Sequence, residues 1–129
     1  MMNTILIIED NADILENLTE YFQSFQYRVL PASNGKCGVE LAQKNLPDLI
    51  ICDICMSDMD GYEVLQHIQI MDATNKIPFI FTTAKSEQID RQKALALGAD
   101  DYLIKPYDME LLLETTKKWI CKISKRCCE

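Results

Sequence analysis

Three carboxylates and one lysine follow short apolar runs of the sequence, in positions where they could act together. Glu9 and Asp10 come directly after one run, Asp53 ends a second, and Lys105 follows a third. If these runs are parallel strands of one sheet, the residues after them meet at its carboxyl edge, where open α/β folds bind ligands. Three carboxylates there would repel one another unless a divalent cation neutralised them. Mg²⁺ suits such a site, because it keeps several waters and takes its other ligands from carboxylates and phosphate.

The chemistry that fits this group is phosphoryl transfer to or near Asp53. A carboxylate is a competent nucleophile toward phosphorus and forms an aspartyl phosphate. Such transfer depends on in-line positioning and on positive charge at the phosphoryl oxygens. Mg²⁺ held by Asp10 and Asp53 would supply two charges and Lys105 a third. Thr82 and Thr83, which end a fourth apolar run, would offer a hydroxyl to one phosphoryl oxygen.

Each of these residues also has a purely structural explanation. Asp10 alone could cap a helix, Lys105 and Pro106 could form only a turn with the proline in cis, and Thr83 could be a satisfied strand-end hydroxyl. These explanations do not account for the convergence of all the residues on one edge of one sheet.

The elements that must position these residues alternate regularly along the chain. Short apolar runs suit strands buried on both faces, and the segments between them have the period of amphipathic helices. Five strands alternating with five helices predict a (βα)₅ fold with a parallel sheet covered on both faces. Right-handed crossovers favour the flavodoxin-like order 2-1-3-4-5, in which Asp10 and Asp53 end the two strands at the switch point. The expected strands are Thr4–Ile8, Arg28–Ala32, Leu49–Asp53, Pro78–Thr82 and Asp101–Ile104. The expected helices are Ala12–Phe25, one that follows the turn signal Asn34-Gly35 and runs to about Lys44, Tyr62–Met71, Ser86–Leu97 and one from Asp108.

The composition fits one globular domain spanning residues 1–129. Hydrophobic residues make up 48% of the chain and charged residues 26%, which excludes a disordered chain. A net charge of −7 argues against direct nucleic-acid binding, which needs Lys and Arg to neutralise phosphates. No apolar run approaches the ~20 residues that span a bilayer, and no secretory signal opens the sequence, so we expect a cytoplasmic protein without a membrane partner. We interpret the basic residues near the end as the solvated face of a last helix; they are Lys117, Lys118, Lys122, Lys125 and Arg126.

Cysteine chemistry does not explain the sequence. Cys52 and Cys55 form a C-x-x-C motif among six cysteines, but no second pair follows at the spacing of a zinc site. Disulfides are rare in cytosolic proteins. We therefore interpret Cys52, which lies in an expected strand, as a small buried hydrophobe.

Four segments, taken in order, resemble the receiver domain of two-component response regulators. Each segment alone is a weak signal, but the four together cover essentially the whole chain at the right separations. They are Ile7-Ile8-Glu9-Asp10-Asn11, Asp53-x-x-Met56-x-x-Met59-Asp60-Gly61, Thr83-Ala84 and Gly98-Ala99-Asp100-Asp101-Tyr102-Leu103-x-Lys105-Pro106.

The resemblance implies a phosphorylation-activated signalling switch rather than an enzyme, apart from Mg²⁺-dependent self-phosphorylation and self-dephosphorylation. By this resemblance Asp53 is the phosphoacceptor and Asp10 a direct Mg²⁺ ligand. Glu9 would reach the metal mostly through water, and the backbone carbonyl of Cys55 would complete the protein ligands.

The resemblance also implies a switch pair and partners. Lys105 would contact the acyl phosphate, and the Thr83 hydroxyl would move toward it and let the Tyr102 ring turn inward. That movement would change the face made by the fourth helix, fifth strand and fifth helix, which would bind an output protein or a fused output domain. The phosphodonor would be a histidine kinase or a histidine phosphotransfer protein. The only histidine here, His67, falls mid-helix, away from the expected site.

Three alternatives remain beside this interpretation. An aspartyl-nucleophile phosphohydrolase would carry a general acid/base carboxylate two residues after the nucleophile, where this sequence has Cys55. An unphosphorylated receiver-like scaffold would have lost Asp53, Asp10 or Lys105, and all three are present. A flavodoxin shares the topology, but the acidic loop after the first strand would repel a flavin phosphate.

Overall fold

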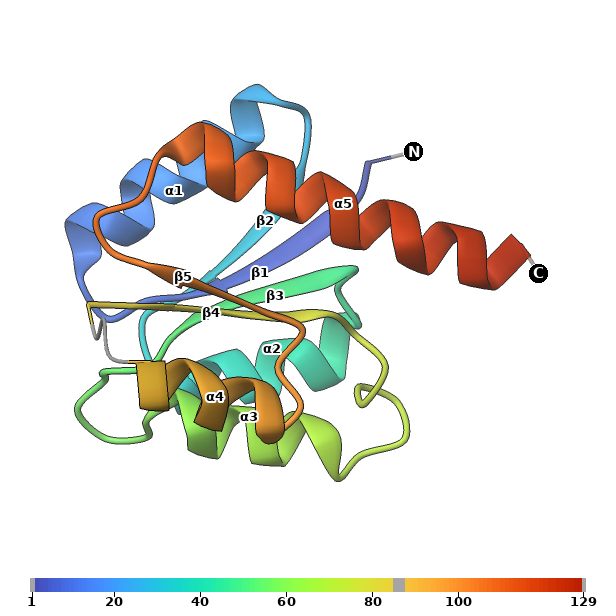
Figure 1. Ribbon diagram of the computed structural model, residues 1–129. Helices are drawn as coiled ribbons and strands as arrows, with labels where there is room; N and C mark the ends of the chain where they lie inside the picture. The colour runs from blue at the N-terminus through green and yellow to red at the C-terminus, as the bar shows by residue number, and fades with distance from the viewer. Residues whose placement is uncertain (1, 85–87, 129) are drawn as a thin grey trace.

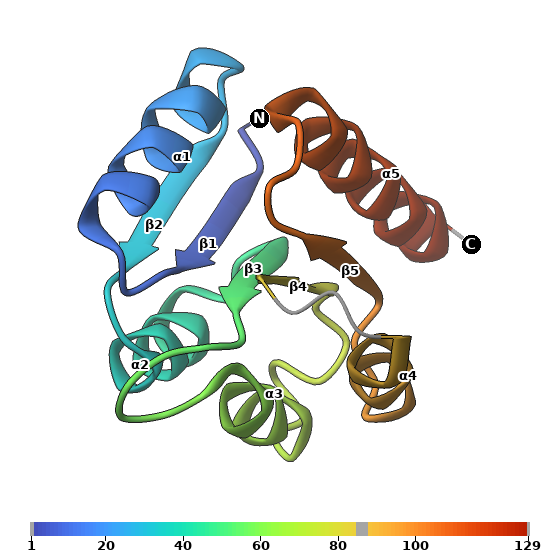
Figure 2. The same ribbon diagram turned by 60° about the vertical axis from the view of Figure 1, so that its left-hand side comes forward.

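The computed structural model describes residues 2–84 and 88–128, with side chains for all of these except 88–90 and 123–128. Five strands form one sheet between two layers of helices, with α1 and α5 on one face and α2, α3 and α4 on the other (Figures 1 and 2). The strands are β1 (Thr4–Ile8), β2 (Arg28–Ala32), β3 (Leu49–Asp53), β4 (Phe79–Thr83) and β5 (Asp101–Ile104). The helices are α1 (Ala12–Ser24), α2 (Gly35–Asn45), α3 (Gly61–Gln69), α4 (Gln88–Ala96) and α5 (Met109–Cys128).

The sheet is parallel throughout, with the order β2-β1-β3-β4-β5 that the sequence predicts. Every residue of β3 and β4 is buried, because helices cover both faces of these central strands. This burial explains why the strands are continuous apolar runs instead of alternating patterns. No helix in the described part of the chain has the length and apolar character needed to cross a membrane.

Two hydrophobic cores hold the layers together, one on each face of the sheet. On one face, Phe79 and Phe81 of β4 stack edge to face with ring centroids 5.0 Å apart and pack with residues of α2 and α3. On the other face, the fully buried Phe22 of α1 and Leu112 of α5 pack against β1 and β3. The sheet is therefore fixed from both sides, and the loops at its carboxyl edge start from rigid strands.

Side chains that cap the helices set where the site loops end. Asn11 caps α1, since its Oδ1 accepts hydrogen bonds from the backbone N–H groups of Asp13 and Ile14 at 3.0 and 3.1 Å. Asp60 caps α3 in the same way, accepting from the N–H of Glu63 at 2.9 Å. The bounds of β1, β2, β3 and β5 are those predicted, and the bounds of β4 and of the helices differ from the predicted ones by one or two residues.

The two apolar residues with which the expected first and fourth helices end are exposed. Phe25 is 45% exposed because α1 ends at Ser24, so this ring lies beyond the helical face that packs on the sheet. Leu97 is 41% exposed because α4 ends at Ala96 and Gly98, at φ 109°, turns the chain away.

Candidate functional site

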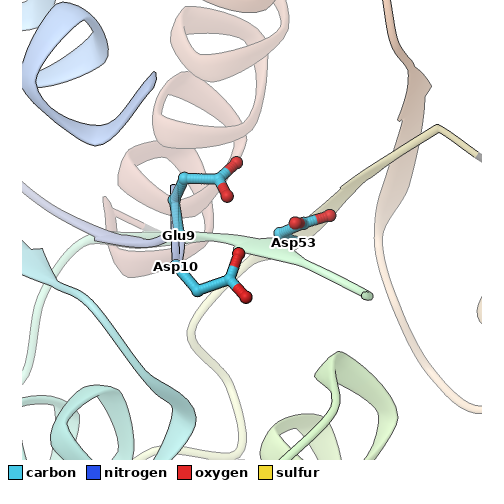
Figure 3. Close-up of side chains that lie close together, drawn as sticks. All are labelled: Glu9, Asp10 and Asp53. Atoms are coloured by element: carbon cyan, nitrogen blue, oxygen red, sulfur yellow. The ribbon is translucent and has the colours of Figure 1, made fainter. Parts of the chain in front are cut away.

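The acidic cluster of Glu9, Asp10 and Asp53 forms where β1 and β3 end side by side. Ile8 pairs with Cys52 in the sheet, so the residues that follow each of them emerge next to one another. One carboxylate oxygen from each of the three residues lies within 4.8 Å of the others. Figure 3 shows Glu9 and Asp10 reaching from the end of β1 toward the space beside Asp53. The convergence expected from the sequence is confirmed.

Glu9 is almost fully buried and paired with a cation. Its Oε1 accepts a hydrogen bond from Lys105 Nζ at 2.7 Å, and its Oε2 accepts from the backbone N–H of Asn11 at 3.1 Å. Burial lowers the pKa of Lys105, but the bond to Glu9 and the charge of Asp53 raise it further, so its pKa is above the ordinary value. Lys105 therefore stays charged and compensates the buried carboxylate. Sequence reasoning missed this direct pair.

Asp53 lies beside Glu9 and Lys105 and is a weaker acid than an ordinary aspartate. It is 6% exposed, and its Oδ2 is 3.6 Å from Lys105 Nζ. Burial and the negative charge of Glu9 raise the pKa of Asp53 from 3.8 to about 6, against the opposing effects of Lys105 and of the Cys55 backbone N–H, which donates to the carboxylate. The surroundings therefore disfavour the ionised form of Asp53.

The loop between β3 and α3 returns closely to the end of β3. The N–H of Gly61 donates to the carbonyl of Ile54 at 2.9 Å. A Cβ atom at Gly61 would lie 2.7 Å from the backbone oxygen of Asp53 and 2.8 Å from Ile54 Cα, which backbone atoms cannot accommodate without moving. The glycine that follows Asp60 in the sequence therefore lets α3 begin directly against the residue at the centre of the site.

The other predicted site residues lie at the ends of β4 and β5. Thr83 ends β4 and is fully buried, and its carbonyl accepts from the Lys105 N–H at 2.7 Å, which ties the two strand ends together. The Lys105–Pro106 peptide bond is cis. Cys55 is exposed, with its Sγ 4.0 Å from Thr83 Oγ1. Tyr102 is 3% exposed and packs in the core that contains Phe81, so its ring lies inward.

The donor set of the acidic cluster fits a hard divalent cation. It consists of carboxylate oxygens, two of them on nearly buried residues, with one lysine as the nearby counter-charge. No cysteine thiol joins this cluster among the residues that the structure describes. Burial, followed by the charges of Asp53 and Glu9, raises the pKa of Cys52 well above its ordinary value, so this cysteine stays a buried thiol, as the sequence predicted. The residues present therefore fit Mg²⁺ better than a softer metal.

A contact further from the site was also missed in the sequence. The indole N–H of Trp119 in α5 donates to Asp101 Oδ2 at 2.9 Å, and Asp101 Oδ1 accepts from the N–H of Tyr102 at 2.9 Å. Asp101 thus joins α5 to the start of β5. The partners are 18 residues apart, and no short motif signals such a pair.

Comparisons with known proteins agree with this geometry. The chain is 35% identical over 124 residues to the response regulator SaeR of Staphylococcus epidermidis. The matched region covers 96% of this chain and 53% of SaeR, so the chain spans about half the length of that relative. It is 36% identical to Protein PilH of Pseudomonas aeruginosa, over 88% of this chain and 94% of PilH.

Solved structures show the same arrangement. The chemotaxis protein CheY4 of Vibrio cholerae superposes with a TM-score of 0.86 at 28% identity, covering 92% of this chain and 98% of CheY4. A response regulator from Chloroflexus aurantiacus superposes with a TM-score of 0.88 at 28% identity, covering 94% of this chain and 99% of that protein. The model of the response regulator receiver domain matches residues 5–117. The chain therefore belongs to the receiver domain family of the response regulators of two-component signalling.

Proposed function

We propose that the protein is a phosphorylation-controlled switch in which Asp53 accepts a phosphoryl group from a phosphohistidine. An Asp53 carboxylate oxygen forms a bond to phosphorus while the bond from phosphorus to the histidine nitrogen breaks, and the imidazole departs. The observation that carries the proposal is the position of Asp53, at the end of a buried strand, between Glu9, Asp10 and Lys105.

Asp53 suits the acceptor role better than its two acidic neighbours. Both carboxylate oxygens of Glu9 already accept hydrogen bonds, from Lys105 and from the Asn11 N–H. Asp10 is exposed, so its carboxylate is the least enclosed of the three. Asp53 is held by the N–H of Cys55 and lies 3.6 Å from the Lys105 ammonium, which would attract a phosphoryl oxygen.

We propose Mg²⁺ as the cofactor, with Asp10 and Asp53 as direct ligands, Glu9 acting through water and the Cys55 carbonyl as a further ligand. Receiver domains normally bind Mg²⁺. When bound, the ion would supply positive charge that offsets the carboxylates and the incoming phosphoryl oxygens. The chain's own contribution is to hold Asp53 at the end of β3 and, through Glu9, to keep Lys105 charged and in place.

Thr83 and Tyr102 are the proposed switch pair. The Oγ1 atom of Thr83 lies 4.0 Å from the Sγ atom of the exposed Cys55, and the Thr83 carbonyl accepts a hydrogen bond from the Lys105 N–H. Movement of the Thr83 hydroxyl toward a phosphoryl group would change the packing available to the Tyr102 ring. We propose that the change appears on the face of α4, β5 and α5 and alters binding of an output protein or output domain.

The proposed phosphodonor is a histidine kinase or a histidine phosphotransfer protein. His67, the only histidine of the chain, is exposed in the last turn of α3 and not among the residues of the site. One relative is named as histidine kinase P4 of Formosa agariphila and another as a probable cyclic di-GMP phosphodiesterase of Vibrio cholerae, so related domains occur in proteins of different outputs. Cys55 in place of a second carboxylate supports a switch over a phosphohydrolase.

The decisive experiment is labelling with phosphoramidate and Mg²⁺, followed by intact mass measurement. Wild type should gain one phosphoryl group that hydroxylamine removes, because an acyl phosphate is labile to that nucleophile. Asp53→Asn should gain none, whereas Asp58→Asn, which removes an exposed carboxylate from the same loop, should be labelled like wild type. Labelling of Asp53→Asn to the wild-type extent would overturn the assignment.

A further inference from the structure

The charge of the chain is divided unevenly between its body and its end. Five of the 13 basic residues and only one of the 20 acidic residues fall in the last 15 positions. Those positions therefore carry a net charge of +4, while the first 114 residues carry −11. The family model matches residues 5–117, so most of this basic stretch lies beyond the part that defines the family.

The fold places the basic stretch at the opposite end of the molecule from the acidic cluster. A helix that follows a parallel strand starts at the carboxyl edge of the sheet and ends at the amino edge. Figure 1 shows the C-terminal part of α5 extending past the ends of the strands. Thirteen residues separate Met109 from Lys122, which is ~20 Å along a helix.

Trp119 positions Lys118 and Lys122, two of the described lysines of this end. Its ring is half-buried and fixed by the hydrogen bond from its indole N–H to Asp101 Oδ2. The Nζ atoms of Lys122 and Lys118 lie 4.4 and 5.5 Å from the centroid of the ring. Neither lysine forms an ion pair with a carboxylate in the described part of the chain. A ring positions a cation without neutralising it, so both charges stay available to an external anion.

We propose that the distal half of α5, centred on Trp119, Lys118 and Lys122, is a docking surface for an acidic helical segment of a partner protein. The two lysines are one helical turn apart, so carboxylates one turn apart on a partner helix match their spacing. A fixed, half-exposed tryptophan beside charges is typical of the residues that dominate protein interfaces. This surface lies on α5, beside the start of β5. It therefore deepens the output face proposed above by naming the chemistry of the partner, and binding to it does not require phosphorylation of Asp53.

The charge distribution favours a compact acidic segment over nucleic acid or an anionic membrane. The Debye length at physiological ionic strength is about 8 Å, so a short segment at the end of α5 is screened from the acidic cluster. A duplex or a membrane surface is extended, and it would lie along a body that carries −11. Such polyanions should therefore be repelled, although their charge matches that of the lysines.

The test uses a synthetic helical peptide with glutamates on one face and leucines on the other, and a matched peptide with glutamine in place of glutamate. Binding to the unphosphorylated protein is measured by titration calorimetry and by the fluorescence of Trp119, the only tryptophan. The glutamate peptide should bind, shift the fluorescence and lose affinity as salt is added. Lys118→Gln with Lys122→Gln should weaken binding about tenfold, the size expected for two partly exposed charge pairs.

Lys36→Gln with Lys44→Gln is the matched control, since it removes two exposed lysines from α2 and gives the same net charge. It should change the affinity less than twofold. The proposal is overturned if the two double variants weaken binding equally, or if the glutamine peptide binds as well as the glutamate peptide. It is also overturned if a DNA duplex or phosphatidylglycerol vesicles bind as tightly, because the partner would then be a different class of molecule. Since no phosphodonor is present, none of these outcomes depends on Asp53.

Discussion

Replacing Asp53 by asparagine should stabilise the metal-free protein at neutral pH. In the folded chain, burial and Glu9 raise the pKa of Asp53 from 3.8 to about 6, so its ionised form is less favourable than in the unfolded chain. A pKa unit corresponds to 1.36 kcal/mol, and a shift of about two units therefore gives a cost of up to about 3 kcal/mol. Because Asp53 is only 6% exposed, solvent screening reduces this little. We expect the free energy of unfolding of Asp53→Asn to exceed that of wild type by about 1–3 kcal/mol, since contributions of neighbouring charges are not strictly additive.

The pH dependence of this gain has a definite sign. Between pH 3.8 and about 6 the folded chain holds a proton on Asp53 more strongly than the unfolded chain does. The contribution of Asp53 to stability is therefore fully present below pH 3.8 and is lost as the pH rises through about 6. Asparagine has no such titration. The difference in the free energy of unfolding between Asp53→Asn and wild type should be near zero at pH 4 and reach its full size above pH 6.5.

Urea unfolding in EDTA, at intervals from pH 4 to 7.5, measures this difference directly. Asp58→Asn serves as the control, because it removes an exposed carboxylate of the same loop, and its effect should stay within about 0.5 kcal/mol at every pH. A variant at Asp53 that is no more stable than wild type at pH 7.5 would refute the electrostatic reasoning. A gain of equal size at pH 4 and pH 7.5 would refute it as well, since the cause would not be the charge of Asp53.

Three further changes test other parts of the molecule. Asp10→Asn should weaken Mg²⁺ binding about tenfold or more by removing a charged ligand; unchanged affinity in calorimetry would exclude Asp10 as a ligand. Thr116→Val should stabilise the protein by about 1 kcal/mol in urea unfolding, because the fully buried hydroxyl has no hydrogen-bond partner among the described residues. Thr115→Val is the control: it loses a hydrogen bond from its hydroxyl to a backbone carbonyl and should give no such gain. Lys93→Met should lower the free energy of unfolding by about 0.5–1 kcal/mol, since the Lys93 Nζ lies 4.5 Å from the centroid of the Tyr62 ring and links α4 to α3. An unchanged midpoint of urea unfolding would show that this contact does not hold α4.

The order and direction of the strands could be predicted from the sequence because helices bury both faces of the sheet. That burial leaves continuous apolar runs such as Leu49–Asp53, and right-handed crossovers then restrict the topology. The convergence of Glu9, Asp10 and Asp53 follows from topology alone, because each residue stands at the end of a strand. Local caps such as Asn11 are also encoded over a few residues.

The contacts that escaped prediction depend on side chains that meet only after the layers have packed. Glu9 and Lys105 are 96 residues apart, and their direct bond depends on the distance between the ends of β1 and β5 across the sheet. Helix ends are similarly decided by local packing: the exposure of Phe25 follows from the end of α1 one residue earlier, which the apolar period does not reveal.

The Glu9–Lys105 pair also decides how the charges of the site are divided. Glu9 and Lys105 compensate each other, which leaves the charges of Asp10 and Asp53 to be balanced by one divalent cation. Since both oxygens of Glu9 accept hydrogen bonds, a direct metal bond from Glu9 would cost one of these contacts, which agrees with the proposed contact through water. Lys105 is then shared between a buried carboxylate at 2.7 Å and Asp53 at 3.6 Å. A phosphoryl group on Asp53 would bring new negative oxygens to the side of Lys105 that faces Asp53. These oxygens would compete with the Glu9 carboxylate for the ammonium group of Lys105.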